Sequence, residues 1–173
     1  LGLRLEHERT WTKARVHAVS RTAEGFALGV QGGETVSAEQ VEWTNVGPHL
    51  LAAPGSLTRL QGTGSPEGAV STRGIGSPNG YLEFRMSDNG TLGLSNGDTN
   101  GLEDDIDFGL ASWYESLYVV ENGEGTDVGT VTSSDVLRIS VENGVFLYGT
   151  AAAVIYTSTT PPQYPLVADA SFD

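Results

Sequence analysis

The chain of 173 residues has no cysteine and no long hydrophobic run. The absence of cysteine excludes disulfides and thiolate metal sites, although it does not decide the cellular compartment. A membrane-spanning helix needs about 18 or more consecutive apolar residues, and the sequence contains no such run. It also lacks an initial methionine and a basic-then-apolar leader, so we expect a processed product or part of a larger chain.

Basic side chains are scarce in most of the sequence. Residues 1–39 balance five basic side chains against five glutamates, whereas the rest of the chain has four arginines against seventeen acids. This second part therefore carries the whole net charge of −13. Because such a surface repels phosphate groups, nucleic acid and anionic lipid are excluded as expected partners.

The first 39 residues form a distinct segment. Residues 3–8, 14–20 and 25–30 alternate apolar and polar side chains, which is typical of half-buried strands. A polar, glycine-rich stretch follows them, and three strands alone make a thin core. We interpret residues 1–39 as a β-rich N-terminal segment, either the end of a preceding domain or an attachment arm.

Residues 40–173 show no extended helical period, and short alternating runs are separated by turn residues. The sequence Val-Glu-Asn-Gly occurs twice, at 120–123 and 141–144, and Asn-Gly between alternating runs is a strong hairpin signal. About a dozen short strands joined by such turns predict an all-β fold, namely an antiparallel β-sandwich. A strand is predicted over 105–111, and 150–155 is a weak helical candidate.

Several stretches resemble a known family. GAVSTRGI, PNGYLEF, GLSNGDTN, DIDF, VVENG, DVLRISVENGV and YPLVADASF occur in this order, as they do in bacterial and phage surface modules similar to SPRY domains. The SPRY-like features are Tyr81-Leu82-Glu83-Phe84, the strand from Asp135 and the Tyr164-Pro165 strand. The resemblance covers residues 41–172 and implies a concanavalin A-like jelly roll, a fold shared by lectins, glucanases and protein-binding modules.

Glycan hydrolysis is one function to weigh. Retaining glucanases of this superfamily use two carboxylates about 5 Å apart. Asp105 and Asp107 are two residues apart, so on the predicted strand they share one face. Phe108 stands where such enzymes have a further glutamate. We therefore expect a solvated strand edge, and no catalytic residue is assigned.

The acidic stretch 96–107 also suggests a cation site. Asn96, Asp98 and Asn100 offer hard oxygen ligands at a spacing loosely like that of a calcium loop, but the EF-hand pattern is absent. The simpler interpretation is that Asp98 and Asn100 cap their own turns. We expect no obligatory cofactor, and calcium stays open as a ligand.

Trp113 and Tyr114 suggest a sugar-binding surface. Adjacent aromatics in an alternating strand cannot both face the core, so at least one points outward. We predict a non-enzymatic recognition module of a larger cell-surface or phage-tail protein, extracellular or on a virion, which binds a polysaccharide or a protein partner through loops at one end. A structural assembly domain and a glycan hydrolase are the alternatives. The predicted ligand-binding residues are Trp113, Tyr114, Asn96, Asp98, Asn100, Asp105 and Asp107.

Overall fold

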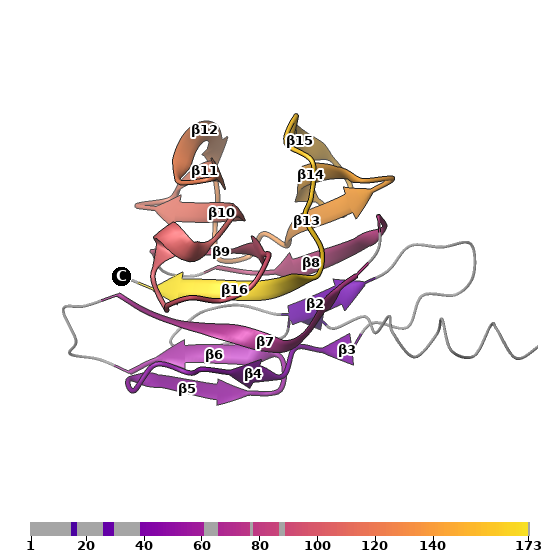
Figure 1. Ribbon diagram of the computed structural model, residues 1–173. Helices are drawn as coiled ribbons and strands as arrows, with labels where there is room; N and C mark the ends of the chain where they lie inside the picture. The colour runs from indigo at the N-terminus through magenta and orange to yellow at the C-terminus, as the bar shows by residue number, and fades with distance from the viewer. Residues whose placement is uncertain are drawn as a thin grey trace, which may run out of the picture.

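The structure, a computed structural model, describes residues 15–16, 26–29, 39–60, 66–76, 78–86 and 89–172. The strands of these ranges form two antiparallel sheets and a short hairpin (Figure 1), so the predicted all-β sandwich is confirmed. Within the described ranges, no helix has the length and hydropathy needed to cross a membrane.

The first sheet has six strands, in the spatial order β1 (Arg15–Val16), β2 (Phe26–Gly29), β8 (Gly80–Phe84), β13 (Leu137–Glu142), β14 (Val145–Thr150) and β15 (Val154–Thr157). The second has seven, in the order β12 (Glu124–Thr130), β11 (Ser116–Glu121), β10 (Phe108–Trp113), β9 (Gly90–Ser95), β16 (Leu166–Phe172), β7 (Glu67–Ile75) and β4 (Trp43–Thr44). The remaining elements are β3 (Glu39–Gln40), the hairpin β5 (Leu50–Ala53) and β6 (Ser56–Arg59), and the 3-10 turn η1 (Glu103–Asp105).

The described part of the N-terminal segment extends the six-stranded sheet. Strand β2 pairs antiparallel with β8, with Ala27 opposite Glu83 and Gly29 opposite Tyr81. The predicted strand at 3–8 lies outside the described residues. The division of the chain at residue 39 stays a prediction.

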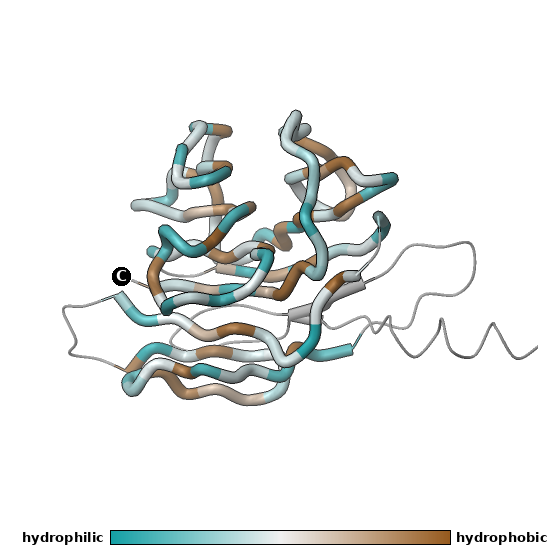
Figure 2. Tube along the Cα trace, viewed as in Figure 1, coloured by the Kyte–Doolittle hydropathy of each residue, from teal (hydrophilic) through white to brown (hydrophobic). Residues whose placement is uncertain are grey.

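Apolar side chains from both sheets form one core, and Figure 2 shows the corresponding alternation of hydropathy along the strands. Phe108 of β10 stacks on Phe146 of β14 with ring centroids 3.9 Å apart. Nearby, the hydroxyl of Tyr148 donates to Glu121 of β11 at 2.8 Å. Burial raises the pKa of Tyr148 far above its ordinary value, and the charge of Glu121 adds to this effect. Ring stacking and a shielded hydrogen bond therefore join the two sheets.

The two Asn-Gly hairpins form as predicted. Asn122 and Asn143 adopt left-handed φ angles of 51° and 53°, and the glycines after them, Gly123 and Gly144, have 81° and 79°. Both central residues of a type I′ turn need positive φ, and asparagine and glycine tolerate it best. These turns set the registers of β11 with β12 and of β13 with β14.

Two local predictions are wrong. Strand β10 begins at Phe108, and residues 103–105 form η1. The weak helical candidate at 150–155 is instead the end of β14, a bend and the start of β15. In both places the chain changes direction, so hydropathy alternation over a few residues does not fix the element.

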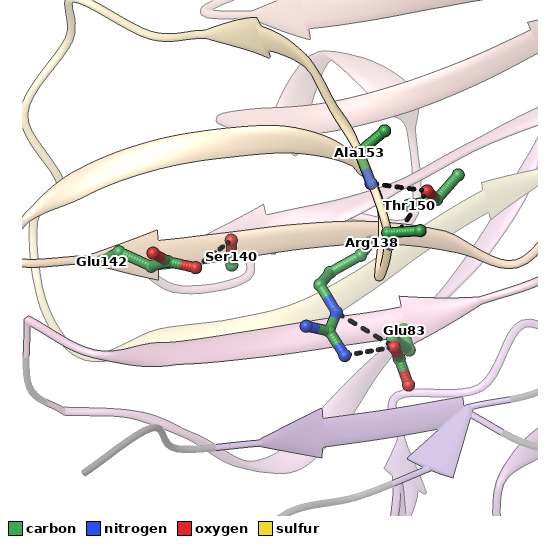
Figure 3. Close-up of polar contacts among 7 residues, drawn as sticks. Glu83, Arg138, Ser140, Glu142, Thr150 and Ala153 are labelled. Carbon is green, nitrogen blue, oxygen red and sulfur yellow. Dashed lines mark hydrogen bonds and ion pairs between the residues drawn. The ribbon is translucent and has the colours of Figure 1, made fainter. Parts of the chain in front are cut away.

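The outer face of the six-stranded sheet carries a cross-strand ion pair (Figure 3). The Arg138 guanidinium on β13 donates from Nε to Glu83 Oε1 on β8 at 2.9 Å and lies 4.2 Å from the ring centroid of Tyr81. Ser140 and Glu142 also interact on this strand. On this face, the charged groups of Arg138 and Glu83 therefore pair with each other across two neighbouring strands.

Candidate functional site

The outer face of the seven-stranded sheet carries small and polar residues near its centre. Gly93 of β9 pairs with Gly109 of β10 on one side and with Asp169 of β16 on the other. One step along the strands, Thr91 pairs with Ala111 and with Ser171. Since strand side chains alternate between faces, these residues form a low platform pointing away from the core.

Residues 96–107, called the acidic loop below, fold back onto this platform. Ile106 is only 1% exposed. A Cβ atom on Gly93 would lie 2.6 Å from the Ile106 side chain, and one on Gly109 would lie 3.1 Å from it. Ile106 therefore packs where two strands lack side chains, and Figure 1 shows the loop lying against β16 and β9.

The middle of the acidic loop is anchored further along the same face. The Gly101 carbonyl accepts a hydrogen bond from Ser171 at 3.2 Å, and Gly101 packs so closely on Gly68 of β7 that a Cβ there would lie 2.7 Å from that carbonyl oxygen. Thr91 donates to Glu103 at 3.5 Å. The loop therefore leaves β9 at one end of the sheet and reaches back toward the other.

Asp105 organises the loop from within. Its carboxylate accepts from the Thr99 backbone N–H at 2.7 Å and hydroxyl at 2.5 Å, and from the Asn100 N–H at 3.3 Å. Partial desolvation raises the pKa of Asp105, but these hydrogen bonds outweigh it and hold the pKa below its ordinary value. The ionised carboxylate is thus part of the loop structure.

Asp107 and Asn96 close the base of the loop. Asp107 accepts from the Asn96 N–H at 2.8 Å, and the Asn96 side chain donates to the carbonyls of Gln163 and Pro165 at 3.2 and 3.0 Å. Asp105 lies in η1 and Asp107 precedes β10, so they do not share a strand face. The geometric premise of a carboxylate pair presented on one strand is therefore wrong.

The other two predicted oxygen donors also have protein partners. Asp98 accepts from the Asn45 side chain, and Asn100 Oδ1 accepts from the Leu102 N–H at 2.7 Å in an Asx turn. In the described ranges, no group of three or more His, Asp or Glu side chains is arranged to hold a metal ion. Asp98, Thr99, Asn100 and Gly101 line a hollow of about 270 Å³ beside the loop.

Asp169 lies beneath the acidic loop, and sequence reasoning missed it. It is 2% exposed, its Oδ2 has no hydrogen-bond partner, and the hydroxyl of Ser95, 1% exposed, also has none. Burial raises the pKa of Asp169 to about 7, and the charges of Asp105 and Asp98 contribute to the rise. No local signal marks this residue, because its surroundings come from a loop more than 60 positions earlier in the chain.

Trp113 and Tyr114, which with Glu115 form the aromatic turn, lie at the far end of β10. Trp113 is 50% exposed and Tyr114 77% exposed, and their rings meet edge to face with centroids 5.7 Å apart. Both rings thus reach solvent, which exceeds the prediction that at least one would. Tryptophan and tyrosine are enriched among the residues that dominate binding interfaces.

The aromatic turn is held in a defined conformation. Tyr114 and Glu115 have left-handed φ angles of 47° and 68°. The Tyr114 N–H donates to Asn89 Oδ1 at 3.0 Å, and the Glu115 carbonyl accepts from the Val131 N–H at 2.9 Å. Contacts from two neighbouring segments therefore fix the backbone that presents the rings.

The predicted site residues fall into two groups. Asn96 and Asp107 lie where β10 begins, whereas Trp113 and Tyr114 lie where it ends, about 17 Å away for a strand of this length. They therefore do not form one compact site at one end. The loop's return to Thr91, opposite Ala111, brings its middle onto the same face as Trp113.

Comparison with solved structures identifies the type of fold. The chain is similar to the crystal structure of the TRIM65 PSpry domain, with a TM-score of 0.61 and 16% sequence identity, over 76% of this chain and 86% of that one. The fold is therefore SPRY-like, as the sequence resemblance implied. Searches of protein families and of curated protein sequences give no match.

Proposed function

We propose that this domain is a non-catalytic recognition module that binds a cell-surface glycan through the aromatic turn. The observation that carries the proposal is the exposure of Trp113 and Tyr114 on a backbone fixed by Asn89 and Val131. A rigid turn loses little conformational freedom on binding, so its rings bind more tightly than the same rings on a mobile loop.

The chemistry of the turn suits a sugar. Indole and phenol rings offer flat apolar faces to the C–H faces of a pyranose, while the Tyr114 hydroxyl and exposed Glu115 carboxylate can hydrogen-bond its hydroxyls. The predicted ligand donors of the acidic loop act differently in this proposal. Asp105, Asp107 and Asn96 maintain the loop, whereas Asp98 and Asn100 border the hollow.

A protein partner is the second candidate. Tryptophan and tyrosine are also the residues that most often dominate protein interfaces. The SPRY-like fold supports this candidate, because SPRY-like domains serve as recognition modules. A setting at a cell surface or on a virion belongs to the same proposal.

A glycan array followed by calorimetry tests whether the domain binds a glycan through the aromatic turn. We expect Trp113→Ala to weaken binding by about 1–3 kcal/mol with the melting temperature nearly unchanged, because a half-exposed ring adds little to the core. Leu51→Ala is the matched control, since Leu51 is 60% exposed but lies in the separate β5–β6 hairpin. An array without signal, with a protein captured through Trp113, would favour the second candidate. Unfolding of Trp113→Ala would show that the ring is structural.

A further inference from the structure

The position of Asp169 is unusual for a carboxylate. An ionised carboxylate taken out of water needs hydrogen bonds or a positive partner, because desolvation is otherwise costly. Only 2% of the surface of Asp169 is exposed, and its Oδ2 makes no hydrogen bond. The charged groups acting on it, Asp105 and Asp98, have the same sign.

The other surroundings of Asp169 cannot neutralise it. Its partners in the sheet are Gly93 on β9 and Val70 on β7, neither of which titrates. Above it, η1 contributes only acidic residues, and Glu103 is hydrogen-bonded to Thr91. The Ser95 hydroxyl and the Ala170 N–H beside the Asp169 carboxyl lower its pKa, but burial and the two like charges outweigh these contacts.

A proton removes the buried charge that these contacts do not compensate. A neutral carboxyl group is a hydrogen-bond donor, and a serine hydroxyl is an acceptor. We propose that protonated Asp169 donates to Ser95 and so holds the acidic loop closed, and that loss of this proton loosens the loop from the sheet.

Because the pKa of Asp169 is raised and that of Asp105 is lowered, the loop is held closed over a limited range of pH. Asp169 has a raised pKa in the closed state, so its contribution is complete below the ordinary value of 3.8 and is lost as the pH rises toward about 7. Asp105 has a lowered pKa, so its contribution is present above 3.8 and is lost at more acidic pH. Closure is therefore strongest near pH 4 and weakens toward neutrality.

Hydrogen exchange of the Thr99 and Asn100 amides measures loop opening, because both amides donate to Asp105 only while the loop is ordered. After correction for intrinsic exchange, we expect protection to fall by up to about tenfold per pH unit between pH 5 and 7, as release of one proton requires. Asp169→Asn should remove this slope. Asp104→Asn is the matched control, because Asp104 is an exposed acid in the same loop, and it should keep the slope.

Protection that does not vary with pH, or a slope that persists in Asp169→Asn, would overturn the inference. If that variant does not fold, the carboxyl carbon chemical shift of Asp169 in the unmodified protein decides. A midpoint near 7 supports the proposal, and one below about 4.5, the ordinary range of aspartate, refutes it. A further experiment adds calcium at pH 7.5. If calcium restores amide protection in the unmodified protein but not in Asp169→Asn, the site binds a cation, and the proposal that a proton holds the loop closed is contradicted. None of these outcomes depends on the glycan.

Discussion

Residues 96–107 and residues 113–115 adjoin opposite ends of β10, and their side chains meet solvent in opposite ways. In the acidic loop, Asp105 and Asp107 accept hydrogen bonds from the loop's own backbone, and Ile106 is buried against the sheet. In the aromatic turn, the backbone is held by neighbours while both rings stay exposed. Residues typical of ligand binding thus stabilise the fold in one region and remain available in the other.

This difference teaches that the hydrogen-bond partners of a polar group decide its role more than its chemistry does. A carboxylate with three donors from its own loop has little capacity left for a ligand, and displacing those donors would cost loop stability. An exposed aromatic ring can bind a ligand without giving up hydrogen bonds that stabilise a loop. The aromatic turn is therefore the better candidate for recognition, although the loop holds more ligand-type atoms.

Removal of Ile106 should produce the largest effect. Ile106→Ala leaves a cavity over Gly93 and Gly109, so we expect unfolding free energy to fall by about 2–5 kcal/mol in urea titrations. Leu102→Ala is the control, because Leu102 is 41% exposed in the same loop and should cost about 0.5 kcal/mol or less. Equal losses of unfolding free energy in the two variants would show that Ile106 does not hold the loop on the sheet. If Ile106→Ala abolished glycan binding while remaining folded, the two regions would instead form one site.

Removal of the Asp105 carboxylate should have a smaller effect. Asp105→Ala deprives the Thr99 and Asn100 amides of their acceptor, and we expect a loss of about 1–2 kcal/mol at pH 6, because partial exposure lets water replace part of the bonding. The difference from the unmodified protein should vanish in strong acid, where the lowered pKa of Asp105 is passed and the carboxylate is protonated. Thermal melts at pH 2 to 6 check this, and a constant difference would contradict it.

The smallest effect concerns the backbone of the aromatic turn. Asn89→Ala removes the acceptor for the Tyr114 N–H, and we expect binding to weaken by about 1 kcal/mol as the turn becomes less ordered. Asn89→Asp keeps an acceptor oxygen and should restore most of the affinity. Calorimetry on the three proteins decides, and an unchanged affinity in Asn89→Ala would mean that ring exposure alone suffices.

Much of the fold could be predicted because its signals are local. The Asn-Gly pairs at 122–123 and 143–144 require positive φ at adjacent positions and formed the expected hairpins. The alternation of apolar and polar residues located most strands. Because adjacent side chains on a strand point to opposite faces, at least one ring of Trp113 and Tyr114 was expected in solvent, and both are exposed. The strand predicted at 105–111 failed in its first part, because hydrogen bonds from Thr99 and Asn100 to Asp105 favour a tight turn over extension there.

The sequence by itself determined the sandwich, its hairpins and the exposure of an aromatic pair, because period-two hydropathy and turn stereochemistry act over a few neighbouring residues. Only the tertiary structure decided where the acidic loop lies and what it covers. The register that sets Gly93 beside Gly109 creates the platform for Ile106, and the pairing of β16 with β9 brings Asp169 beneath the loop. Such contacts join distant segments, so no local pattern in the chain records them.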